Sequence, residues 1–138
     1  MGKKQIDHDG SMNKALSDQQ IEQFREQGFL AGLRVWDDNT VERAQSHFRQ
    51  VTAELESKGL THNDVNGWWA INRTYWNLCS TTGILDCLED LLGPDLFVFE
   101  GQYFLKNPGD GTTVPWHQDI QYWSLMRGKP IVSAWVAL

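Results

Sequence analysis

The first half of the chain carries the apolar spacing of amphipathic helices. Ser17 and Gln20 form a capping box that begins one helix, and Gly28 provides its natural end. A longer helix is predicted from the Asp and Asn capping residues at positions 37–39 to about Lys58, because apolar residues recur three and four positions apart along it. The stripe consists of Val41, Ala44, Phe48, Val51 and Leu55.

The segments around these helices are predicted from shorter patterns. Residues 29–36 are rich in apolar side chains and predict a short strand, whereas the Asn- and Asp-rich residues 60–67 predict a loop. Residues 68–78 predict irregular structure around one turn of helix. Capping threonines and a terminal Gly-Pro pair predict another helix over residues 83–92.

The second half of the chain changes to the pattern of strands. Residues 96–106 alternate, and one side of that segment, with Glu100, Gln102 and Lys106, is too polar for a core and suits the wall of a pocket. Gly- and Pro-containing turns then separate a predicted strand at residues 115–123 from a strongly apolar strand at residues 131–138.

Helices followed by strands predict an α+β fold in which N-terminal helices pack on a partial jelly roll. A jelly roll needs about eight strands, whereas four or five are predicted here, so we expect it to be truncated at the C-terminus. The last strand would lack a partner and could mediate self-association. We expect residues 1–12 to be a disordered leader or cloning scar, and residues 13–138 to be the N-terminal part of a single domain.

Composition excludes several classes of function. The net charge of −6 and the absence of a basic cluster argue against nucleic-acid binding. No apolar run approaches the roughly 20 residues of a membrane helix, and no secretory signal is visible. Cys79 and Cys87 do not form a Cys-x-x-Cys pair, so we interpret them as reduced thiols and expect a cytoplasmic protein. Seven tryptophans indicate either a thick core or the lining of a pocket.

The sharpest chemical feature is His117 followed two positions later by Asp119. On an extended strand these side chains point to the same face, so their donor atoms can meet at one metal ion. Two histidines and one carboxylate are the ligand set of non-haem Fe(II) oxygenases. A structural hydrogen-bonded pair is the alternative reading.

The sequence on both sides of His117 and Asp119 resembles a known family. WHQDIQYW at residues 116–123 and VSAWVAL at residues 132–138 resemble the phytanoyl-CoA dioxygenase family, and LKNPG at residues 105–109 resembles the stretch before its metal motif. Residues 27–30 are similar to its first helix–strand junction. The resemblance implies a double-stranded β-helix and an enzyme that couples oxidative decarboxylation of 2-oxoglutarate, with O₂, to hydroxylation of a small-molecule substrate.

The resemblance also implies roles for single residues. His117 and Asp119 would be catalytic Fe(II) ligands. Trp135 would line the 2-oxoglutarate pocket, and Gln102 and Lys106 would contact this co-substrate. Glu100 and Trp123 would contact the substrate.

The chain contains no evident third iron ligand and no Arg to clamp 2-oxoglutarate, so we expect the 138-residue chain alone to be inactive. The alternative function is a non-catalytic module that binds a small ligand or partner through its aromatic pocket and its exposed last strand.

Overall fold

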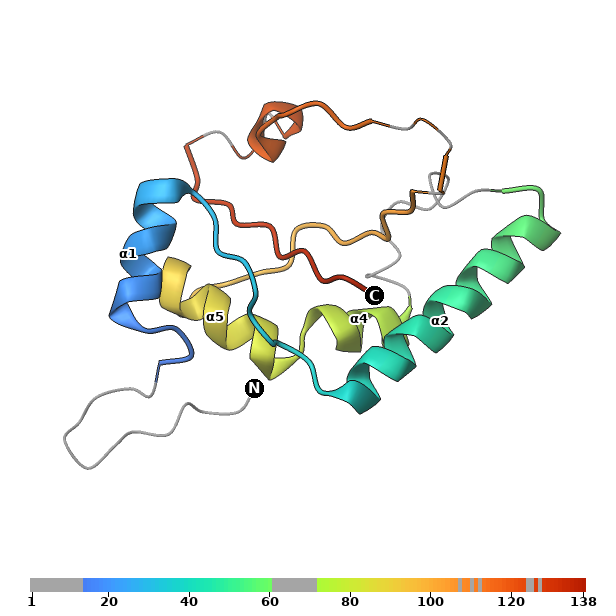
Figure 1. Ribbon diagram of the computed structural model, residues 1–138, viewed down its shortest axis with the longest axis horizontal. Coiled ribbons are helices and arrows are strands. Elements are labelled where there is room, and N and C mark those ends of the chain that lie inside the picture. The colour runs from blue at the N-terminus through green and yellow to red at the C-terminus, as the bar shows by residue number, and fades with distance from the viewer. Residues whose placement is uncertain are drawn as a thin grey trace.

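The computed structural model describes residues 14–60, 72–106, 108–109, 111, 113–123, 126 and 128–138. In this part of the chain helices come first and extended segments follow, with one short 3₁₀ helix between two of those segments (Figure 1). The helices are α1 (Asp18–Gln27), α2 (Asp38–Ser57), α4 (Arg73–Cys79), α5 (Thr82–Leu92) and the 3₁₀ helix η2 (Asp119–Tyr122). None of the described helices is long and apolar enough to cross a membrane.

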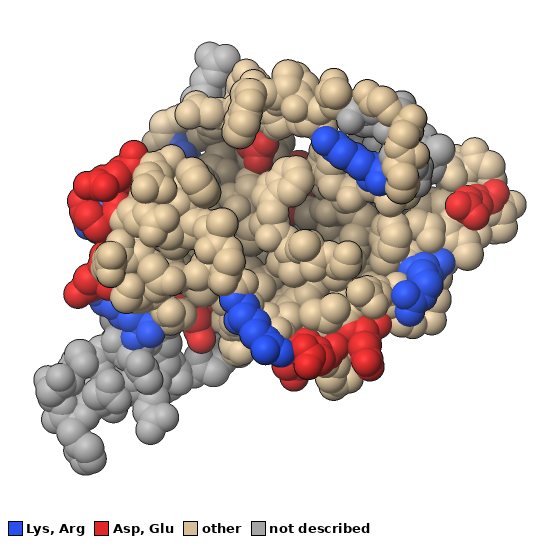
Figure 2. Space-filling view, viewed as in Figure 1, with Lys and Arg blue, Asp and Glu red and all other residues tan. Residues whose placement is uncertain are grey.

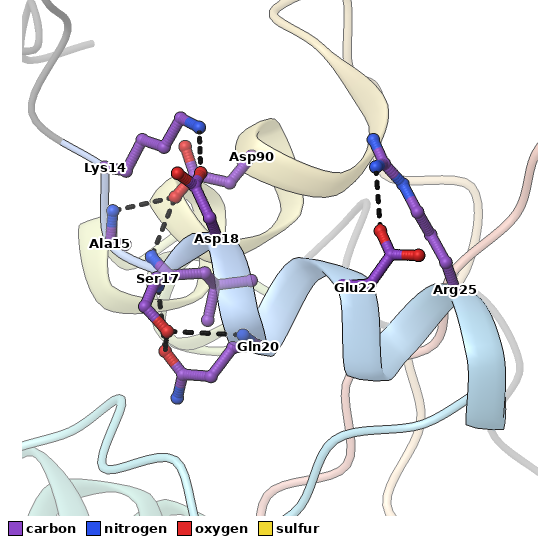
Figure 3. Close-up of polar contacts among 9 residues, drawn as sticks. Lys14, Ala15, Ser17, Asp18, Gln20, Glu22, Arg25 and Asp90 are labelled. Atoms are coloured by element: carbon purple, nitrogen blue, oxygen red, sulfur yellow. Dashed lines mark hydrogen bonds and ion pairs between the residues drawn. The ribbon is translucent and has the colours of Figure 1, made fainter.

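Helix α1 begins with the predicted capping box. The Ser17 hydroxyl accepts a hydrogen bond from the Gln20 backbone N–H at 3.2 Å, and the Gln20 side chain accepts one from the Ser17 N–H at 2.9 Å (Figure 3). Gly28 ends the helix in the left-handed conformation, with φ of 80°. Its N–H returns to the carbonyl oxygen of Phe24. The boundaries predicted for this helix are therefore confirmed.

The residues just before α1 are hydrogen-bonded to α5. One carboxylate oxygen of Asp90 accepts hydrogen bonds from the backbone N–H groups of Ala15 and Leu16, at 2.7 and 2.9 Å (Figure 3). The side chain of Leu16 is 1% exposed, which makes it the most completely buried large side chain of the described residues. The N-terminal segment is thus an integral part of the helical core.

Helix α2 follows its predicted apolar stripe. The Asp37 carboxylate accepts a hydrogen bond from the Thr40 N–H at 2.7 Å and begins the helix. Ala44, Val51 and Leu55 are buried, and the helix packs against α4. The same buried side of α2 carries His47, so polar and apolar groups share this part of the core.

The predicted α+β fold with a jelly roll is wrong for the described residues, because they form helices and extended segments but no strand. Residues 96–106 and 131–138 are extended, yet no backbone hydrogen bond joins them. A sheet requires such bonds between neighbouring chains, whereas an alternating sequence requires only an extended backbone. Residues 29–36, predicted as a strand, are likewise outside any strand.

The predicted alternation is present without a sheet over residues 100–106, whereas Phe97 and Phe99 are exposed instead of buried. Glu100, Gln102, Phe104 and Lys106 are exposed, whereas the residues between them are half-buried against the helices. A Cβ atom added at Gly101 would lie 3.2 Å from both the Cys79 sulfur and a ring carbon of Tyr75. Glycine therefore lets this segment lie directly on α4.

Three further predictions fall partly or wholly outside the described residues. Irregular structure around one turn of helix is predicted for residues 68–78, and the helix in this segment is α4, which begins at Arg73 and is longer than one turn. The Asn72 side chain accepts a hydrogen bond from the Tyr75 N–H at 2.9 Å and caps this helix. The rest of that segment, most of the predicted loop at residues 60–67 and the proposed leader at residues 1–12 lie outside the described residues.

Candidate functional site

His117 and Asp119 converge although they do not lie on a strand. Gln118 between them has φ of −110° and ψ of 129°, so the backbone is extended at this residue, and η2 begins at Asp119. The predicted strand over residues 115–123 is wrong, because its second part is this 3₁₀ helix. The single extended residue is sufficient to direct both side chains to one point, and His117 Nε2 lies 3.2 Å from Asp119 Oδ1.

The atoms of these side chains that face away from each other are both hydrogen-bonded. His117 Nδ1 lies 2.8 Å from the carbonyl oxygen of Pro115, and the Ser133 hydroxyl donates to Asp119 Oδ2 at 2.5 Å. A carbonyl oxygen only accepts, so Nδ1 carries the hydrogen and the Nε2 atom of the neutral imidazole presents its lone pair. Ring and carboxylate are therefore both held in place from outside.

This arrangement fits a metal ion. In the neutral form of His117 the Nε2 lone pair lies 3.2 Å from Asp119 Oδ1, so one cation can bind both atoms, whereas in the protonated form the same contact is an ion pair. Metal-bound histidines typically donate their second ring N–H to a carbonyl or carboxylate, as His117 does to Pro115. The side chains are 22% and 33% exposed, so the site is shielded but open to small molecules. The role of His117 and Asp119 as catalytic metal ligands stays a prediction.

Aromatic residues flank the pair in the sequence, and one of them contacts His117. The Tyr122 ring lies edge-on to the His117 ring, with centroids 5.6 Å apart. The Trp123 ring packs in the same manner on Phe99 at 5.1 Å, and so connects η2 to the segment at residues 96–106. Trp116 is fully exposed. Of the tryptophans near the motif, Trp123 contacts a neighbouring segment and Trp116 contacts solvent.

The residues predicted to bind 2-oxoglutarate and substrate lie on the adjoining extended segments. Trp135 follows Ser133 by two positions and lies against Phe104, with ring centroids 5.4 Å apart. Phe104 shares the outward side of its segment with Glu100, Gln102 and Lys106. Figure 2 shows the molecule hollowed below the segment that carries η2. The binding roles of Trp135 and Trp123 stay predictions. The same holds for the roles of Glu100, Gln102 and Lys106.

His47 is buried in the core and contacts aromatic side chains, which does not suit a metal ligand. Its Nδ1 atom shares a hydrogen bond with the Tyr103 hydroxyl at 2.9 Å, and its ring is buried beside Tyr75. Burial lowers the pKa of His47, and the Asn72 side chain opposes this shift. Asn72 nevertheless does not reach Nε2 with the geometry of a hydrogen bond, so Nε2 lacks a partner among the residues that the structure describes. His47 is therefore a packed core residue.

A third metal ligand is not found in the part of the chain that the structure describes. No group of three or more His, Cys, Asp or Glu side chains gathers there. His8 and His62 lie outside the described residues. Cys79 is half-buried, and burial raises the pKa of its thiol, so it is a poor metal ligand.

Sequence reasoning missed the two groups that hold the pair. Ser133 is 14 residues from Asp119, and no spacing rule connects an isolated serine to a carboxylate at that distance. The Pro115 carbonyl is part of the backbone and carries no residue signal. A useful clue would have been that Ser133 is the one hydroxyl residue in an otherwise apolar stretch at residues 131–138.

Comparison with known proteins gives one match. The family model described as phytanoyl-CoA dioxygenase (PhyH) matches residues 16–138, which includes every residue discussed above from Leu16 onward. Searches among curated proteins and among solved structures found no match.

Proposed function

Since the chain belongs to the phytanoyl-CoA dioxygenase family, we propose that it is a non-haem Fe(II)- and 2-oxoglutarate-dependent dioxygenase that hydroxylates a small organic substrate. The observation that carries this proposal is the approach of His117 Nε2 to Asp119 Oδ1 at 3.2 Å, with the opposite atom of each side chain already hydrogen-bonded. A neutral imidazole and a carboxylate are ligands that suit Fe(II). When bound, Fe(II) supplies the redox chemistry by which O₂ and 2-oxoglutarate oxidise the substrate.

The extended segments supply the groups that would bind the co-substrate. 2-Oxoglutarate is a dianion, so the ammonium group of Lys106 offers it a positive charge and Gln102 offers hydrogen-bond donors. Both residues lie on the exposed side of their segment together with Phe104, which contacts Trp135. In the proposal, Trp135 offers an apolar face on which the co-substrate packs.

The substrate would lie between the same segment and η2. Glu100 offers hydrogen-bond acceptors on the exposed side, and Trp123 offers an aromatic face beside Phe99. Acyl-CoA, amino-acid, osmolyte and natural-product substrates are all compatible with one carboxylate and one aromatic ring. Succinate release across a panel of these four classes would identify the substrate class.

Two protein ligands hold iron weakly, so we expect weak Fe(II) binding and little turnover by the 138-residue chain. The test is anaerobic addition of Fe(II) and 2-oxoglutarate, which should give a weak visible charge-transfer band. His117→Ala and Asp119→Ala should abolish this band. His47→Gln is the matched control, because it removes a buried histidine that contacts Tyr103 instead, and it should retain the band. A band that persists in His117→Ala would contradict the proposal.

A second candidate is a non-catalytic binding module. It is favoured by the exposure of Phe97 and Trp135, each 72% exposed, which places large aromatic side chains in contact with solvent. This candidate predicts no iron-dependent band. It also predicts concentration-dependent self-association through residues 131–138, measurable by sedimentation, that Trp135→Ser weakens.

A further inference from the structure

Ser133 makes the one side-chain contact that holds Asp119 from outside the motif among the described residues. Its hydroxyl donates to Asp119 Oδ2 at 2.5 Å, across a separation of 14 residues. A hydroxyl–carboxylate hydrogen bond of this length is charge-assisted, and such bonds are about twice as strong as neutral ones. The bond also connects the extended segment at residues 131–138 to the first residue of η2. Ser133 therefore determines how the carboxylate is presented.

The two oxygens of Asp119 are engaged differently. Oδ2 receives the serine hydrogen, whereas Oδ1 faces His117 Nε2. Rotation of the carboxylate about its Cβ–Cγ bond would break the contact with Ser133. The carboxylate thus offers one oxygen to a metal ion, and the coordination positions that a bidentate carboxylate would fill stay open for small molecules.

The imidazole is held in a parallel manner. His117 Nδ1 is bonded to the Pro115 carbonyl, so the ring presents Nε2 alone. That contact is made by the backbone and survives any substitution at position 115. The serine contact is made by a side chain, so it can be removed without changing either ligand.

We infer that Ser133 is a positioning residue of the metal site, which holds Asp119 as a one-oxygen ligand beside His117. This inference rests on the proposed function, because it assigns a role to Ser133 only if the pair binds a metal ion. Partners of this kind typically change metal affinity 10- to 100-fold when they are removed. We expect a loss of about 10-fold for Ser133→Ala, because the site is partly exposed.

The experiment uses Co(II) alone as the probe, with its visible absorption and tryptophan fluorescence as readouts. Ser133→Ala should weaken Co(II) binding by about 10-fold and change the absorption of the bound ion. Ser133→Thr keeps the hydroxyl and suits an extended backbone, so it should bind Co(II) as the unaltered chain does. Ser57→Ala is the matched control, because it removes a serine hydroxyl that bonds only the Glu54 carbonyl at the end of α2.

The outcomes separate the inference from the function on which it rests. Equal affinity and absorption for Ser133→Ala and the unaltered chain, when His117→Ala binds no Co(II), would overturn the role of Ser133 alone. Equal binding by His117→Ala and the unaltered chain would overturn the metal site and the inference together. A loss in both Ser133→Ala and Ser133→Thr would show a merely structural role and would also overturn the inference.

Discussion

The Nδ1 atom of His47 and the hydroxyl oxygen of Tyr103 lie 2.9 Å apart, and this hydrogen bond joins α2 to the extended segment at residues 96–106. The Tyr103 ring also meets Phe48 and Tyr75 edge-on, with centroids 5.1 and 4.9 Å away. Burial raises the pKa of Tyr103 to about 12, so its hydroxyl keeps its hydrogen at neutral pH. The segment that carries the predicted co-substrate contacts is thus fixed to the core from its inner side.

The buried imidazole predicts that the fold weakens in mild acid. Burial lowers the pKa of His47 below its ordinary value of 6.5, so the unfolded chain binds this proton at a higher pH than the folded chain. The free energy of unfolding should therefore fall as the pH decreases from 6.5 to the lower pKa of the folded state. Urea denaturation at about pH 7.5 and about pH 5 measures this change.

His47→Gln provides the comparison, because glutamine is polar but does not titrate. The difference in stability between the two pH values should be smaller in this variant than in the unaltered chain. An identical difference in the two proteins would show that His47 does not contribute to the pH dependence.

Removal of the Tyr103 hydroxyl should destabilise the fold. In Tyr103→Phe, both ring nitrogens of His47 lack a hydrogen-bond partner among the described residues, because Nε2 has none already. An unpaired buried polar group costs about 1–3 kcal/mol, and urea denaturation should show a loss of this size. In a His47→Leu background the same substitution should cost less, since no polar partner is left unpaired. An equal cost in both backgrounds would assign the effect to ring packing instead.

Gly83→Ala should destabilise the chain although it lies in a helix. Alanine in a helix interior is favoured over glycine by about 1 kcal/mol. A Cβ atom at this position, however, would overlap the backbone carbonyl of Val35, which cannot move as a side chain can. Overpacking of this kind costs about 1–3 kcal/mol, so we expect a lower thermal midpoint by circular dichroism. Thr82→Ala, at the exposed neighbouring position, should change stability by less than about 0.5 kcal/mol.

Asp119→Asn removes the negative charge of the side chain and keeps its shape, so it should lower the affinity for Co(II) without changing stability. The asparagine side-chain oxygen can still accept the hydrogen bond from Ser133, so we expect the free energy of unfolding to change by less than about 0.5 kcal/mol. Without the negative charge, the Co(II) affinity should fall at least about tenfold in a fluorescence titration. Unchanged affinity would mean that Asp119 is not a ligand.

The sequence predicted those parts of the fold that depend on neighbouring residues. The caps at Ser17 and Asp37 and the stop at Gly28 are local hydrogen-bond patterns, and α1 and α2 begin or end where they indicate. The strands were predicted wrongly, because an alternating sequence specifies an extended backbone but not a hydrogen-bonded neighbour. Residues 100–106 show this directly, because exposed and half-buried side chains alternate there although no strand forms. At residues 97–99 the predicted order is reversed, since Phe97 and Phe99 are exposed and Val98 is half-buried.

In the candidate site, too, the local geometry was predictable from the sequence and the contacts between distant residues were not. The convergence of His117 and Asp119 follows from a spacing of two residues and one extended residue between them. The contacts that hold the pair were not predictable, because Ser133 reaches it from another segment and Pro115 acts through its backbone. Leu16, the most buried large side chain described, was also missed, since its burial depends on Asp90 at the far end of α5.

That contact of Asp90 has a consequence for how the molecule opens. A single carboxylate oxygen holds the backbone N–H groups of both Ala15 and Leu16, and these amides directly precede the cap of α1. The two amide hydrogens lose this acceptor when the end of α5 moves away or loses its helical form. In heavy water, the amides of residues 15 and 16 should therefore exchange together with those of the last turn of α5, so that the beginning of the described chain reports on the opening of a helix some seventy residues later.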